Sequence, residues 1–128
     1  MDQYTTMCSK LTELQGEWEP TKGDWVYSVV DFDVICIADI QIPAIKKFIK
    51  DFIWFPTLEQ LVGMMPKGYI KICSPTIHGT YWTVDFTMGA NTWNSFTHTE
   101  LKIVMLQALA WARWGKKWDK EKGEWIKP

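Results

Sequence analysis

The sequence lacks the features that identify several common protein classes. Its longest uninterrupted apolar runs, such as residues 34–38 and 108–112, are far shorter than the roughly 18 residues that a membrane span needs. No basic and apolar leader opens the chain, so we expect neither secretion nor a membrane partner. With 47% hydrophobic and 23% charged residues, the composition excludes intrinsic disorder, collagen and a long coiled coil. It indicates one soluble globular domain.

Cysteine and histidine are also scarce. The three cysteines, Cys8, Cys36 and Cys73, are odd in number and contain no CxxC pair, which argues against a structural zinc site and against disulfides. We therefore expect a reducing, intracellular compartment. Cys36 lies in an apolar run, where we expect a small buried thiol.

No constellation of catalytic residues stands out. His78, Cys73 and Asp85 surround one predicted hairpin, but their spacings of five and seven residues match no metal-ligand pattern. Asp31 and Asp33 are two apart on a predicted turn, where solvated carboxylates are usual. Neither GxGxxG nor GxxxxGK[ST] occurs. We therefore predict no enzyme, no catalytic residue, no metal and no cofactor.

Charge is nearly balanced overall but unevenly distributed. The net charge is −1, so the whole molecule exerts no attraction on nucleic acid or anionic membranes. Residues 1–39 carry eight acids against two bases, whereas residues 113–128 carry six bases against three acids. A surface polarised in this way is able to orient a charged partner.

The first half of the chain predicts one short helix and one hairpin. Met7, Leu11 and Leu14 recur at helical spacing over residues 5–15, with Gly16 just afterwards. Residues 25–30 and 34–40 are rich in β-branched and aromatic side chains and are expected to pair as a hairpin. Residues 42–52 fit a helical face, yet residues 52–55 fit a strand equally well, and both alternatives stay open.

The second half gives stronger signals. Thr57 and Gln60 form a capping box for a helix over about 58–65, and residues 69–73 and 80–86 alternate as two strands. A second capping box, Thr97 with Glu100, is expected to open the longest helix, which Gly115 ends. That helix is apolar on a second side, which predicts a homodimer with contacts near Ile103, Leu106 and Trp114.

These elements predict a single α+β domain over residues 1–128, with an antiparallel sheet packed by two or more helices. Residues 1–17 are a candidate mobile N-terminal helical arm. Residues 118–126 are expected to form a C-terminal hairpin, because two Trp residues flank a charged turn that contains Gly123.

Aromatic residues supply the candidate binding sites, since the chain has nine Trp, four Tyr and six Phe. One group is interleaved with basic residues, as stacking on bases and contact with phosphates require: Trp111, Trp114, Lys117, Trp118 and Trp125. A second group borders the loop at 89–91 and either lines a pocket or completes the core: Tyr81, Trp82 and Trp93.

Several short aromatic motifs carry a resemblance. In chain order, the motifs are Glu19-Pro20, Gly23-Asp24-Trp25-Val26, residues 52–56 leading into 58–61, Trp118-Asp119 and Gly123-Glu124-Trp125. They are similar to motifs of small uncharacterised proteins encoded in phages and prophages of Firmicutes. The order helix, two strands, helix in residues 57–115 also resembles the phage ABA-sandwich layout. The resemblance implies a phage accessory gene expressed in a bacterial cytoplasm, and it implies no known activity.

The sequence therefore predicts a non-enzymatic protein that acts by binding. We expect host counter-defence, either by occluding a host protein or by sequestering a nucleotide-like ligand. The alternative is a single-stranded nucleic-acid-binding module that uses the C-terminal Trp and Lys residues.

Overall fold

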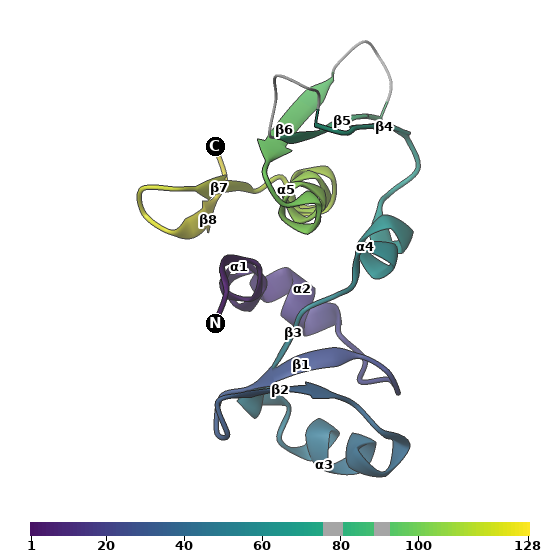
Figure 1. Ribbon diagram of the computed structural model, residues 1–128, viewed down its shortest axis with the longest axis vertical. Helices are drawn as coiled ribbons and strands as arrows, with labels where there is room; N and C mark the ends of the chain where they lie inside the picture. The colour runs from purple at the N-terminus through teal and green to yellow at the C-terminus, as the bar shows by residue number, and fades with distance from the viewer. Residues whose placement is uncertain (76–80, 89–92) are drawn as a thin grey trace. The chain divides into compact units, whose positions relative to one another are not determined.

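The computed structural model describes residues 1–75, 81–88 and 93–128. Helices and antiparallel strands mix within them, which confirms the α+β class. Close contacts divide the chain into two compact units, Met1–Thr57 (unit 1) and Leu58–Pro128 (unit 2), each with an antiparallel sheet of its own (Figure 1). One domain over residues 1–128 stays a prediction. None of the described helices is long and apolar enough to cross a membrane.

Unit 1 begins with two helices, α1 (Gln3–Lys10) and α2 (Thr12–Glu17). The single helix expected over residues 5–15 is interrupted at Leu11, whose φ of −89° and ψ of 85° are not helical. The Tyr4 hydroxyl donates a hydrogen bond of 2.6 Å to the carbonyl of Pro56, which ties the expected arm to the far end of unit 1. Burial is the main cause that raises the pKa of Tyr4, so its hydroxyl keeps the proton that it donates.

The unit 1 sheet has the order β2-β1-β3, with both pairs antiparallel. The predicted hairpin is confirmed as β1 (Trp25–Ser28) and β2 (Asp33–Cys36). After η1 (Asp39–Gln41), the segment left open holds both a helix and a strand: α3 (Ile42–Lys47), η2 (Ile49–Asp51) and β3 (Phe52–Trp54). The expectation of a buried Cys36 is wrong, because β2 is an edge strand and this thiol is exposed.

Unit 2 places one long helix against a second sheet. Its elements are α4 (Leu58–Met64), β4 (Tyr69–Cys73), β5 (Trp82–Thr87), β6 (Asn94–His98) and α5 (Leu101–Trp114). The sheet order is β4-β5-β6, and α5 lies against β5, β6 and α4 (Figure 1). Val84 and Phe86 of the central strand are buried, which fits the alternation predicted for β5.

The capping box predicted for the longest helix is wrong at both members. Thr97 lies in β6, opposite Thr83, and Glu100 is the N-cap residue without a side-chain capping bond. His98 Nδ1 accepts the N–H of this N-cap residue at 2.9 Å and so satisfies one main-chain donor at the start of α5. The C-terminal end is as predicted, since Gly115 has a φ of 63°.

Two of the three residues expected at the second apolar side of α5 are buried in the single chain. Ile103 and Leu106, expected near a dimer contact, have no exposed surface, and Trp114 is half-buried. The homodimer stays a prediction, but Ile103 and Leu106 offer it no contact surface.

The C-terminal hairpin is confirmed as β7 (Lys117–Asp119) and β8 (Glu124–Ile126). Trp118 lies opposite Trp125, with ring centroids 5.2 Å apart in an edge-to-face arrangement. Asp119 closes the turn by accepting the N–H groups of Glu121 and Lys122 at 2.9 and 3.1 Å.

Candidate functional site

The loop that joins β1 to β2, residues 29–32, has a fixed backbone; we call it the β1–β2 tip. The pair Ser28–Asp33 closes the hairpin beneath it. Ser28 is buried, and its Oγ accepts the N–H of Asp31 at 3.2 Å. The N–H of Val29 donates to the carbonyl of Asp51 at 2.9 Å. These bonds join the tip to Ser28 of β1 and to Asp51.

Phe32 stands out in this tip for both its backbone and its exposure. Its φ of 54° is the only positive value at a non-glycine among the described residues. That region costs an L-residue about 1–2 kcal/mol and is usually occupied by glycine or asparagine. The Phe32 side chain is 78% exposed, so burial within the chain does not offset the cost. A strained and exposed aromatic is typical of a functional position.

The surroundings of Phe32 are apolar and acidic. Val30 in the same tip is 63% exposed, and the carboxylates of Asp31 and Asp33 flank Phe32 in the sequence. Unit 1 as a whole carries nine acidic residues against five basic ones, a formal balance of −4. The tip therefore presents an apolar side chain within a negative field.

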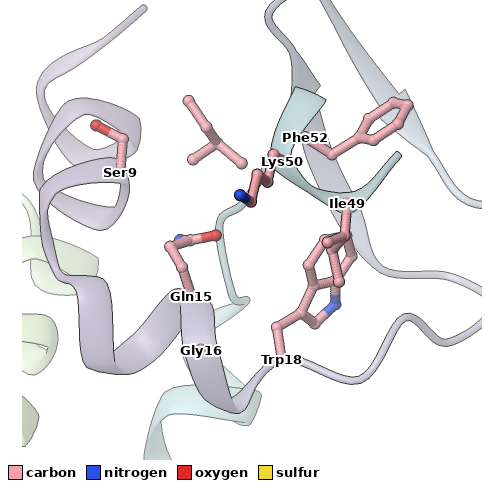
Figure 2. A pocket seen from close by; sticks show the side chains of 8 residues that line it. Ser9, Gln15, Gly16, Trp18, Ile49, Lys50 and Phe52 are labelled. Atoms are coloured by element: carbon pink, nitrogen blue, oxygen red, sulfur yellow. The ribbon is translucent and has the colours of Figure 1, made fainter. Parts of the chain in front are cut away.

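Unit 1 also contains a pocket with a volume of about 430 Å³ (Figure 2). Eight residues line it: Ser9, Gln15, Gly16, Trp18, Ile49, Lys50, Phe52 and Ile53. The Trp18 ring stacks on Trp54, with centroids 6.2 Å apart and planes 11° apart. Its indole N–H donates to buried Asp24 at 3.0 Å, which fixes the ring. The pocket wall is therefore preformed.

The C-terminal candidates come together in pairs. Lys117 Nζ lies 4.8 Å from the centroid of the Trp111 ring, and the guanidinium of Arg113 lies 5.0 Å from that of Trp114. Trp118 and Trp125 contact each other, and Trp125 is buried. A nucleobase stacking here would compete with these contacts inside the chain. The nucleic-acid alternative stays a prediction.

The second aromatic group is not brought together. Trp82 lies opposite His98, whereas Phe86 lies opposite Asn94, the neighbour of Trp93. Trp82 and Trp93 therefore stand at opposite ends of the β5–β6 pair, about 17 Å apart along the strands. Tyr81 and Trp93 are exposed. The loop at 89–91, which these residues were expected to border, lies outside the described residues.

The structure offers no metal centre within the residues that it describes, where no three His, Cys, Asp or Glu side chains cluster. His78, the histidine of the metal alternative, lies outside these residues. Sequence reasoning missed both Phe32 and the unit 1 pocket. The signal for Phe32 was present as an aromatic residue between two carboxylates in a predicted turn.

Comparisons with protein-family models, with curated proteins and with solved structures gave no match.

Proposed function

We propose that this protein acts by binding another protein, with the β1–β2 tip as its contact and Phe32 as the anchor. The observation that carries the proposal is the combination of a left-handed backbone and an exposed ring at Phe32. Neither the turn nor the core benefits from a phenylalanine there. Burial of the ring in a partner would gain about 1.5–3 kcal/mol, enough to offset the backbone cost.

The side chains of the β1–β2 tip indicate the kind of surface that the partner presents. The ring and Val30 fit an apolar pocket, and the carboxylates of Asp31 and Asp33 fit a rim of Lys or Arg side chains. Opposite charges around an apolar centre favour rapid association and correct orientation. In the phage setting that the resemblance implies, the partner is a host protein and the activity is counter-defence by occlusion.

A photo-crosslinking experiment tests this function. Benzoylphenylalanine replaces Phe32, and in a control it replaces Val62 of α4, which is 44% exposed. Both proteins are irradiated in a Firmicutes lysate. We expect a single crosslinked host protein when the photo-crosslinker is at position 32, and none when it is at position 62. An excess of the wild-type chain should abolish this crosslink, whereas an excess of Phe32→Ala should not.

Affinity for the identified partner then tests the role of each group. Phe32→Ala is expected to weaken binding about 30-fold, as a central aromatic anchor does. Asp31→Asn combined with Asp33→Asn is expected to slow association, most strongly at low salt. Val62→Ser serves as the unchanged control. Equal crosslinking from positions 32 and 62, or equal affinity of Phe32→Ala, would overturn the proposal.

A further inference from the structure

The unit 1 pocket is built from two segments that are distant in the sequence. Ser9, Gln15, Gly16 and Trp18 come from α1, α2 and the residue after α2, whereas Ile49, Lys50, Phe52 and Ile53 come from η2 and β3 (Figure 2). Its volume of about 430 Å³ lies within the range of small-molecule sites. It is separate from the β1–β2 tip, since none of residues 29–32 lines it.

The walls of the pocket are held rigidly. Gln15 is fixed by three hydrogen bonds, two to the main chain of Trp54 and one to the carbonyl of Cys8. Trp18 is fixed by Asp24 and by its stacking on Trp54. The entropy lost by ordering these side chains when a ligand binds is therefore small.

The lining selects for aromatic character. Trp18, Phe52, Ile49 and Ile53 supply aromatic and aliphatic walls. Gly16 leaves one side open, because a Cβ built at this position would meet nothing within 4 Å. Flat rings are bound well by such surfaces, since stacking and edge contacts add to the burial of area.

The charge of the lining selects for an anion. Among the described residues that line the pocket, Lys50 alone is charged, and none carries a carboxylate. Within the described residues, the Lys50 ammonium has neither an ion pair nor a hydrogen bond. An ammonium beside an apolar wall attracts an anionic group and disfavours a cationic one.

We propose that the unit 1 pocket binds a compact aromatic anion, whose ring meets the apolar wall and whose anionic group meets Lys50. A nucleoside monophosphate and an aromatic carboxylate share this chemistry. This site is independent of the β1–β2 tip, so its test bears on the pocket alone.

Titration followed by NMR tests the proposal on the full chain. The probes are uridine monophosphate, indole-3-acetate, uridine and inorganic phosphate, each added to about 5 mM, a range that detects weak binding. The indole N–H resonance of Trp18, assigned by its loss in Trp18→Phe, reports on the pocket. We expect a saturable shift with one of the two aromatic anions and none with uridine or phosphate. Which of the two binds distinguishes a nucleotide from a carboxylate.

Three variants separate the pocket from other surfaces. Lys50→Gln is expected to weaken binding about tenfold, whereas Lys46→Gln on α3, which does not line the pocket, leaves it unchanged. Gly16→Leu, checked for folding by urea titration, fills the open side and abolishes the shift. The proposal is overturned if neither aromatic anion shifts Trp18, if uridine binds as well as its monophosphate, or if Lys50→Gln binds equally.

Discussion

The side-chain amide of Gln15 pairs with the main chain of Trp54 on both sides. Gln15 Oε1 accepts the N–H of Trp54 at 2.9 Å, and Nε2 donates to the carbonyl of Trp54 at 2.7 Å. Since β3 is an edge strand of the order β2-β1-β3, this amide takes the place that a further strand would occupy. It also joins α2 to the sheet and so fixes one wall of the pocket.

Replacing Gln15 by Ala should therefore destabilise the protein. We expect the free energy of unfolding to fall by about 2 kcal/mol, because main-chain groups of the half-buried edge lose their partners. Urea titration measures the change. Gln41→Ala is the matched control, since Gln41 Oε1 accepts a single exposed bond, from the N–H of Ala38. Its expected loss is below about 0.5 kcal/mol, and equal losses would contradict the strand-like role of Gln15.

The stacked residues Trp18 and Trp54 differ in the hydrogen bonding of their indole N–H groups. The indole N–H of Trp18 donates to buried Asp24, whereas the indole N–H of Trp54 is buried and finds no partner among the described residues. Trp18→Phe removes one hydrogen bond of buried Asp24, whose Oδ2 still accepts the N–H of Thr21 at 3.0 Å, and should cost about 1.5 kcal/mol beyond the loss of ring volume. Trp54→Phe loses ring volume alone. Guanidinium unfolding of the two variants should rank Trp18→Phe as the less stable, and the reverse order would refute this assignment of their hydrogen bonds.

Local signals explain what the sequence could predict. Both hairpins, at β1–β2 and β7–β8, pair residues close in the chain, and Gly115 ends α5 through its own backbone. The pairing of β3 with β1, by contrast, joins residues that are far apart in the chain, such as Tyr27 and Ile53, which are separated by 26 positions. Gln15 contacts Trp54 across 39 positions. Periodicity and turn chemistry carry no information on such partners, so the unit 1 pocket that depends on them was not predicted.

Strand β6 shows a different cause of error. Its residues Asn94–His98 are mostly polar, and Thr97-His98-Thr99-Glu100 satisfies the pattern of a capping box. Pairing with β5 outweighed that local preference and placed Thr97 in the sheet. A polar strand next to a helix start is thus indistinguishable from a cap by sequence alone.

The start of α5 allows a direct test of the corrected cap. His98→Ala should lower the free energy of unfolding by about 1 kcal/mol, because Nδ1 no longer accepts the N–H of Glu100. Thr97→Ala, an exposed strand position, should change it by less than about 0.5 kcal/mol. Thermal unfolding of both variants measures the difference. A larger loss for Thr97→Ala would restore the capping box.

The strain at Phe32 gives the last prediction. Phe32→Gly should raise the free energy of unfolding by about 0.5–1 kcal/mol, because relief of the left-handed backbone outweighs the greater freedom of glycine in the unfolded chain. Phe32→Ala should change it little, since alanine shares the cost of that conformation. Val30→Gly is the control in the same tip. Val30 has no positive φ, so glycine there should lower stability by about 0.5–1 kcal/mol. Urea titration compares the three variants. If Phe32→Gly loses stability as Val30→Gly does, the Phe32 ring stabilises the fold of the protein itself. The strain at Phe32 would then give no support to a contact with a partner.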